Sequence, residues 1–190
     1  MTEDFNPVKV TPLSIPDVLL IEPQIFKDER GLFFESFNQS AFNAATKINI
    51  LFVQDNHTES LRGALRGLHY QKPPMAQAKL VRVTEGEVFD VVVDLRHQSP
   101  TFGQWLSTIL SKDNQKQLFI PEGFAHGYLT LSDRATFLYK TNQFYSPEHE
   151  RSIRWDDETL HINWPKADRL MVSSKDSNAI SFNRSETYFI

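Results

Sequence analysis

The chain has 190 residues, 40% of them hydrophobic and 23% charged, and a formal net charge of −4. These values are typical of a globular protein, and the length fits one domain. The lack of cysteine excludes a disulfide framework, thiolate metal ligands and a cysteine nucleophile, and indicates a cytoplasmic protein. The net charge predicts neither nucleic acid nor a membrane surface as a partner. We expect no secretory signal in "MTEDFNPVK" and no membrane span.

Short segments of alternating polarity dominate the chain and predict β-strands. In chain order these strands are Val18–Ile21, Leu32–Phe37, Ile48–Gln54, Leu65–Gln71, Lys79–Thr84, Val88–Leu95, Gln104–Leu110, Gln117–Ile120, Tyr128–Ser132, Thr136–Thr141 and Ile153–Trp155. Two short helices are expected, at Gln39–Thr46 and Ser173–Ala179. Many strands with Pro- and Gly-containing turns predict an all-β, antiparallel sandwich or barrel, with a jelly roll as the preferred form. The barrel interior is then the expected ligand site.

The segment "RGLHYQKPPMAQAKL", residues 66–80, contains the first candidate chemical groups. In a regular strand Arg66 and His69 point to opposite faces, unless Gly67 marks a β-bulge. If His69 and Lys79 both face the interior, a base and a cation share one pocket. One interpretation of His69 is a core histidine that bonds to the backbone. The other is a base beside a cation that serves an anionic ligand, because an unpaired buried lysine is costly.

A metal-binding cupin is an alternative use of a histidine in such a barrel. Those sites place two histidines one residue apart, whereas this spacing offers His69 and Gln71. His126 adds only one distant ligand, and "PEGFAHGY" is alternatively a tight turn with His126 partly exposed. Because a site with open positions normally has three protein ligands, we predict no metal site.

Other polar residues have two interpretations each. Tyr139 is either a packed tyrosine or a proton donor opposite an imidazole. Asp176 is either a surface or helix-start acid or, if the C-terminal segment folds back, the partner that orients His69. Arg30 and Arg66 either bind pyrophosphate in a bidentate manner or form surface salt bridges with nearby acids.

Taken together, these motifs resemble the dTDP-4-dehydrorhamnose 3,5-epimerase family, cofactor-free sugar-nucleotide epimerases of the cupin superfamily. The resemblance extends in the family's order from about residue 15 to 177. It implies a cupin-type jelly roll without cofactor or metal. It also implies epimerisation at C3 and C5 of dTDP-4-dehydro-6-deoxy-D-glucose to dTDP-4-dehydro-L-rhamnose. The matching stretches are "FKDERGLFFESF", "FVQDNHTES", "LRGLHYQKPPMAQAKLVRV", "GEVFDVVVDLR", "SPTFGQWLSTILS", "QLFIPEGFAHGY", "FLYKTNQFYSPEHE", "IRWDD" and "SSKD".

The resemblance also implies a role for each matching position. His69 would remove the proton next to the C4 ketone, with Asp176 as its dyad partner. Lys79 would stabilise the enolate oxygen, and Tyr139 would return a proton on the opposite face. Phe26 and Phe144 would sandwich the thymine, although the family often has tyrosine at the second position. The other positions that would hold the nucleotide sugar are Arg30, Glu35, Gln54, Asn56, Arg66, His126, Glu150 and Lys175.

Family members are homodimers in which an N-terminal segment crosses to the neighbouring subunit. Here that segment would be about residues 1–38, and Phe26 and Arg30 would serve the partner's site. The first dozen residues and the tail "ISFNRSETYFI" depart from the family pattern.

Three alternatives on the same fold stay open. A relative that inverts only C3 or only C5, or acts on another 4-keto sugar nucleotide, keeps the same four catalytic positions. A 3,4-ketoisomerase is the second alternative. A non-catalytic sugar-nucleotide binding module is the third, and it predicts a broken catalytic position, whereas His69, Lys79, Tyr139 and Asp176 are all present.

Overall fold

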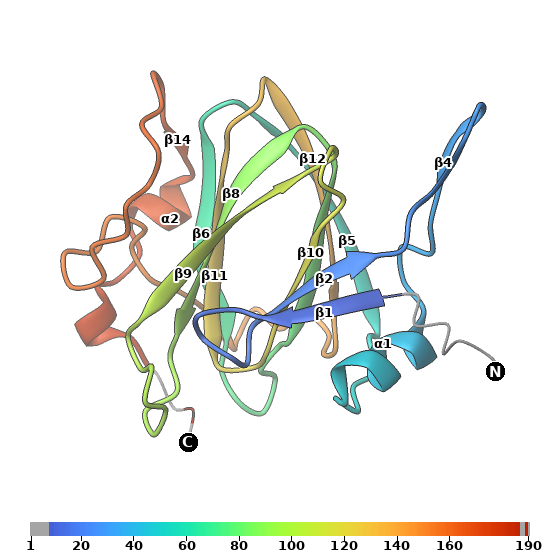
Figure 1. Ribbon diagram of the computed structural model, residues 1–190. Helices are drawn as coiled ribbons and strands as arrows, with labels where there is room; N and C mark the ends of the chain where they lie inside the picture. Colours follow the sequence, from blue (N-terminus) through green and yellow to red (C-terminus); the bar gives the residue numbers. More distant parts are fainter. Residues whose placement is uncertain (1–7, 187–188, 190) are drawn as a thin grey trace.

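The computed structural model describes residues 8–186 and 189, which form a barrel of two β-sheets packed face to face (Figure 1). The first sheet has the order β1-β2-β10-β7-β12-β5 and the second the order β13-β6-β11-β8-β9. All pairings within these two orders are antiparallel, while β14 joins β6 in parallel. The expected all-β barrel with few short helices is therefore confirmed.

The elements have the following bounds. The first sheet contains β1 (Val8–Pro12), β2 (Leu19–Pro23), β10 (Gln117–Ile120), β7 (Lys79–Glu85), β12 (Arg134–Thr141) and β5 (Gln54–Leu61). The second contains β13 (Glu150–Ser152), β6 (Ala64–Gln71), β11 (Phe124–Thr130), β8 (Glu87–Asp94), β9 (Trp105–Ser111) and β14 (Met171–Val172). A separate hairpin consists of β3 (Phe26–Asp28) and β4 (Gly31–Phe33). The helices are α1 (Gln39–Thr46), α2 (Ser174–Ser177) and a 3₁₀ turn at Phe182–Arg184, and none in the described part of the chain is long and apolar enough to cross a membrane.

The main core lies between the two sheets and follows from the period of the strands. Alternate residues of β7, such as Val81 and Val83, face the opposite sheet, where Val88 and Val92 of β8 meet them. Leu118 and Phe137 belong to the same cluster, and all of these side chains are at most 1% exposed. Burial of such apolar surface is the main favourable contribution to folding.

Both sheets are also covered on their outer faces. Val91 and Val93 of β8 point away from the main core, yet they are fully buried in a cluster that includes Phe182 and Phe189 of the C-terminal segment. On the first sheet, Phe42 of α1 packs in a third cluster of buried side chains. This double burial explains why β8 reads as the nearly continuous apolar run "VFDVVV".

The predicted helix Gln39–Thr46 has the predicted bounds because both of its ends are capped. Asn38 has extended backbone angles, and its side-chain oxygen accepts a hydrogen bond from the Ala41 amide at 3.1 Å. Lys47 has a left-handed backbone (φ 61°), and its amide donates to the Asn43 carbonyl. The predicted strand Gln117–Ile120 likewise coincides with β10.

Several predicted strands are displaced. The prediction for residues 48–54 is wrong, because β5 begins only at Gln54. Ile48, Ile50 and Phe52 instead pack beside α1 without joining a sheet. The predicted strand 32–37 is limited to β4, 128–132 belongs to a strand that starts at Phe124, and 153–155 is replaced by β13. Strands β1, β3 and β14 were not expected.

Leu118 provides a test of the main core. It is 0% exposed between the sheets, so Leu118→Ala should lower the free energy of unfolding by about 2–5 kcal/mol in urea denaturation. Ile109→Ala removes a side chain that is 38% exposed on β9 and should cost about 1 kcal/mol or less. Equal losses from the two substitutions would contradict the position of this core.

Candidate active site

A cavity of about 150 Å³ lies within the barrel and draws residues from five strands. Chemically active side chains face it from both sheets, which is unusual for a core that serves stability alone. The lining residues are Thr58, Arg66, His69, Lys79, His126, Gly127, Tyr128, Phe137 and Tyr139.

His69 is hydrogen-bonded to Asp176, which α2 supplies. The His69 Nε2 and Asp176 Oδ1 atoms are 2.5 Å apart, and Asp176 is 3% exposed. Burial raises the pKa of this carboxyl, but the bond from His69 and further donors outweigh burial, so the pKa is lowered. A carboxylate only accepts hydrogen bonds, so Nε2 carries the ring proton and Nδ1 is the nitrogen that acts as a base.

The start of α2 places Asp176. The Ser173 side chain caps the helix by accepting a hydrogen bond from the Asp176 amide at 3.1 Å. The second carboxylate oxygen of Asp176 accepts from the Gly67 amide at 3.4 Å. Of its two sequence interpretations, the structure therefore shows both a helix-start acid and the partner of His69.

An irregularity at Gly67 brings Arg66 and His69 to the same cavity. Across the β6–β11 pair, His69 lies opposite His126 and Arg66 lies opposite Tyr128. The step from His69 to Arg66 covers three residues of β6, whereas the step from His126 to Tyr128 covers two residues of β11. This extra residue is a β-bulge, and it is the condition under which Arg66 and His69 can point to the same side. Gly67 has φ +132°, and a Cβ there would lie 2.5 Å from the Gly127 Cα, so the two backbones approach too closely for a side chain.

Lys79 is a buried cation at the wall of the cavity. Lys79 is only 8% exposed, and its ammonium donates a hydrogen bond to the His69 carbonyl at 3.3 Å. Burial lowers its pKa from 10.5 to about 8, although the charges of Asp90 and Glu150 oppose the shift. Lys79 therefore stays largely protonated at neutral pH.

His126 belongs to a second buried histidine–aspartate pair, which the sequence did not reveal. Its Nε2 is 2.9 Å from Asp90 Oδ2, and both residues are buried. Burial lowers the pKa of His126 and raises that of Asp90, while each charge favours the other. The interpretation of His126 as a partly exposed turn residue is wrong, because it lies within β11. In the sequence, the one feature that could have indicated Asp90 is that it is an acidic residue within the apolar run "VFDVVVD".

Tyr139 lies on the opposite sheet from His69. Burial raises the pKa of its phenol, the charge of Glu150 adds to this, and Arg66 opposes it. The phenol is therefore protonated at neutral pH and able to donate a proton. Its ring lies 6.2 Å from that of Phe137, as expected for two residues on one face of β12.

The remaining residues of the predicted site fall into two sets, and the first belongs to β5, β13, α2 and the segment after β12. The Gln54 amide donates to Asn56 Oδ1 at 2.9 Å, and the Asn56 amide donates to the Tyr139 carbonyl at 3.3 Å.

Glu150 pairs with Lys175 at 2.5 Å and accepts a hydrogen bond from the Tyr145 hydroxyl at 2.8 Å. These bonds outweigh burial and lower the pKa of Glu150. Phe144 follows β12 and is 61% exposed.

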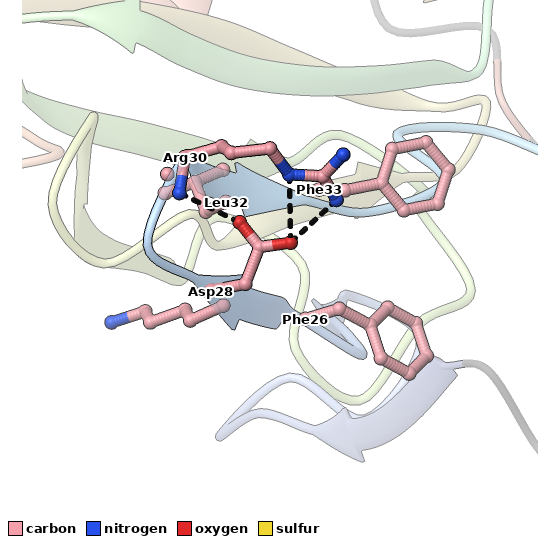
Figure 2. Close-up of a pocket in the computed structure, with 7 residues that line it drawn as sticks. Phe26, Asp28, Arg30, Leu32 and Phe33 are labelled. Atoms are coloured by element: carbon pink, nitrogen blue, oxygen red, sulfur yellow. Dashed lines mark hydrogen bonds and ion pairs between the residues drawn. The ribbon is translucent and has the colours of Figure 1, made fainter.

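The second set lies on the N-terminal segment, away from the cavity of its own chain. Phe26 and Arg30 belong to the β3–β4 hairpin, which projects from the barrel (Figure 1). Figure 2 shows Arg30 folded onto Asp28, with its Nη2 2.6 Å from the carboxylate, as the salt-bridge interpretation expects. Phe26 is 47% exposed, and Glu35 is exposed with Asn38 as its neighbour at 3.3 Å.

Among the described residues, no group of three or more His, Asp or Glu side chains is arranged to hold a metal ion. The chemistry available in the cavity is instead a carboxylate-held imidazole, a buried ammonium and a buried phenol. Such a set can remove a proton next to a carbonyl, stabilise the resulting oxyanion and return a proton. The fold and the site thus define an isomerase of the cupin type.

Comparison with known proteins gives the family. A sequence model of dTDP-4-dehydrorhamnose 3,5-epimerase matches residues 12–184. The enzyme of that name from Pseudomonas aeruginosa is 57% identical over 175 residues, which are 92% of this chain and 96% of the relative. The chain belongs to the dTDP-4-dehydrorhamnose 3,5-epimerase family.

Solved structures agree with this assignment. The structure of dTDP-6-deoxy-D-glucose-3,5-epimerase from Legionella pneumophila, in complex with dTDP-4-keto-L-rhamnose, has a TM-score of 0.91 at 46% identity. It covers 94% of this chain, and the match spans 95% of the Legionella chain. A 3'-monoepimerase from Streptomyces bikiniensis, in complex with dTDP-quinovose, is also similar, with a TM-score of 0.84 at 36% identity over 90% of this chain and 86% of its own.

Gly67 and Gly31 form a matched pair for testing the close approach at the site. Both have a positive φ, +132° and +133°, but a Cβ at Gly31 meets nothing within 4 Å. Gly31→Ala should therefore cost only the backbone strain, about 1 kcal/mol. Gly67→Ala should cost about 1–3 kcal/mol more in urea denaturation, because the methyl group collides with Gly127. Equal costs would show that β6 and β11 are not in close contact at Gly67.

Proposed function

We propose that this protein epimerises C3 and C5 of dTDP-4-dehydro-6-deoxy-D-glucose to give dTDP-4-dehydro-L-rhamnose, a step of dTDP-rhamnose biosynthesis. The observation that carries the proposal is the His69–Asp176 pair beside the buried Lys79 in the barrel cavity. The family membership and the ligand named in the Legionella structure support it.

The reaction requires a base and a stabilised enolate. C3 and C5 are both adjacent to the C4 carbonyl, so the electrons of either C–H bond can move to the carbonyl oxygen when the proton leaves. Nδ1 of His69 takes that proton, and the Asp176 carboxylate stabilises the imidazolium that forms. The ammonium of Lys79, which is buried at the wall of the cavity, stabilises the enolate oxygen.

Inversion requires a proton from the other face. Tyr139 lies on the sheet opposite His69 and has a protonated phenol, so it delivers a proton to the carbon as the carbonyl re-forms. Tyr139 then recovers its proton from solvent, and His69 releases the one that it accepted. No electrons are gained or lost in the cycle.

The nucleotide part of the substrate lies along the rim of the cavity. Arg66 contributes a guanidinium that suits the diphosphate, while Phe144 presents an exposed ring to the thymine. Binding energy from these distant groups holds the ketone in register with His69. The other rim residues assigned to the nucleotide sugar are Gln54, Asn56, His126, Glu150 and Lys175.

We further propose that the chain is a single cytoplasmic domain that works as a homodimer. Phe26 and Arg30 stand on a hairpin that projects from its own barrel, and Glu35 follows that hairpin, so they serve the neighbouring subunit's cavity. Strand β5 lies at the edge of the first sheet and offers its backbone to a partner. The exchanged segment is about residues 1–38, of which the first seven lie outside the described residues.

Solvent-deuterium incorporation tests the reaction. Incubation with dTDP-4-dehydro-6-deoxy-glucose in D2O and EDTA should give exchange at both C3 and C5 by NMR. His69→Asn should slow this exchange by at least about 10³-fold, because the base is lost. His161→Asn alters an exposed histidine outside the cavity and should leave it unchanged. Exchange at one carbon indicates a single-site epimerase, and none indicates a binding module or another substrate.

Mixed dimers test the position of Arg30. Arg30→Ala and His69→Asn should each be nearly inactive alone. If Arg30 serves the partner's cavity, unfolding and refolding an equal mixture should restore about a quarter of the wild-type activity, because half of the dimers are mixed and each has one intact site. If Arg30 served its own cavity, each mixed dimer would have two damaged sites, and no activity would return.

A further inference from the structure

Asp90 is a buried carboxylate to which the proposed reaction gives no role. It lies in the middle of β8, is 0% exposed, and bonds through Oδ2 to Nε2 of His126 at 2.9 Å. Its other oxygen, Oδ1, accepts no hydrogen bond from the described residues. A buried, half-satisfied carboxylate beside a site for an anionic substrate is costly, so its presence calls for a reason.

The surroundings of Asp90 indicate what it does. His126 lines the cavity, whereas Asp90 is not among the lining residues and so lies behind the imidazole. The negative charge of Asp90 also acts on Lys79, which lines the same cavity. A substrate therefore meets His126 and Lys79, and Asp90 acts on it only through them.

We propose that Asp90 is a positioning residue that fixes the ring proton of His126 on Nε2 and keeps the ammonium of Lys79 charged while the cavity is empty. This inference rests on the proposed epimerase function, in which Lys79 must carry a proton to stabilise the enolate. The carboxylate accepts only, so a hydrogen bond at 2.9 Å requires the proton on Nε2 and leaves Nδ1 of His126 for the substrate.

The charge balance of the cavity supports the second part. Other charged or titratable groups face this part of the barrel from four strands: Arg66 and His69 of β6, His126 and Tyr128 of β11, Tyr139 of β12, and Glu150 of β13. Burial already lowers the pKa of Lys79 to about 8, and Asp90 is the larger of the two charges that oppose this. Without Asp90 the pKa would fall toward neutrality, and a growing share of the enzyme would lack the ammonium.

The dependence is mutual. Burial raises the pKa of Asp90, while the hydrogen bond from His126 and the positive charge of Lys79 oppose that rise. Asp90 and Lys79 therefore favour each other's charged form, which a hydrogen bond to His126 alone would not require. Neutralising Asp90 should change the titration of Lys79 even where the fold is preserved.

The pH dependence of kcat/KM tests this. In the wild type, activity should fall as pH rises through about 8, where Lys79 loses its proton. Asp90→Asn keeps the shape and one acceptor but removes the charge, so this alkaline limb should move to lower pH by about one unit or more. Tyr139 does not produce the limb, because burial raises its pKa above the ordinary value of 10.0.

Asp94→Asn is the matched control. Asp94 lies four residues further along β8, is also 0% exposed, and is held by Arg96 at 2.8 Å rather than by His126. Its replacement should leave the alkaline limb where it is, whatever it does to stability. An unmoved limb in folded Asp90→Asn, or an equal movement in Asp94→Asn, would overturn the proposal.

Two further measurements need no turnover, and the first of them needs no variant. In ¹⁵N-histidine NMR of the wild-type protein, His126 should carry its proton on Nε2, and finding it on Nδ1 would overturn the proposal even if Asp90→Asn fails to fold. In folded Asp90→Asn, the ¹⁵N signal of the Lys79 ammonium should titrate at lower pH than in the wild type. If no epimerisation occurs at all, the proposed function fails, while these two readouts still decide the role of Asp90.

Discussion

The hydrogen bond between His69 and Asp176 joins positions that are 107 residues apart, and much of the C-terminal architecture serves it. After β13 the chain must return to β6, and it does so through the parallel pairing of β14 with that strand. Beyond α2, the Tyr70 hydroxyl donates to the Glu186 carbonyl at 3.0 Å, and the Glu186 carboxylate pairs with Lys72 and Arg151. The segment that supplies Asp176 is thus anchored to β6 on both sides of α2.

The sequence predicted the class of fold well because most strands bury one or both faces, so hydrophobic periodicity reports them. Strand β5 is the exception and explains the largest error. Its alternate residues Asn56, Thr58 and Ser60 are polar although they are only partly exposed or buried, and the residues between them are exposed. A strand with two polar faces has no hydrophobic period, whereas the apolar residues just before it pack beside α1 and resemble a strand.

The types of the residues predicted the members of the candidate site better than the alternation of the strands predicted where their side chains point. The chemistry of His69, Lys79, Tyr139 and Asp176 was accessible from their types and from the family motifs, and the structure brings these four together. Alternation alone placed Arg66 on the wrong face, and only the extra residue at the Gly67 bulge reverses this. Bulges depend on the opposing strand, so a single sequence offers the glycine as a possibility and not the register.

Asp90 was missed for a related reason: a lone acid within an apolar run has the same pattern whether it points to solvent or into the core. Its role depends on Lys79, a residue of the other sheet whose pKa the charge of Asp90 raises. The same environment then acts in opposite directions on the acids of the cavity, since burial lowers the pKa of Lys79 and raises that of Tyr139. Both nevertheless stay protonated at neutral pH, Lys79 with the help of Asp90 and Tyr139 without it. Burial thus favours the protonated form of the phenol but disfavours that of the ammonium, so only the ammonium needs a carboxylate such as Asp90 nearby.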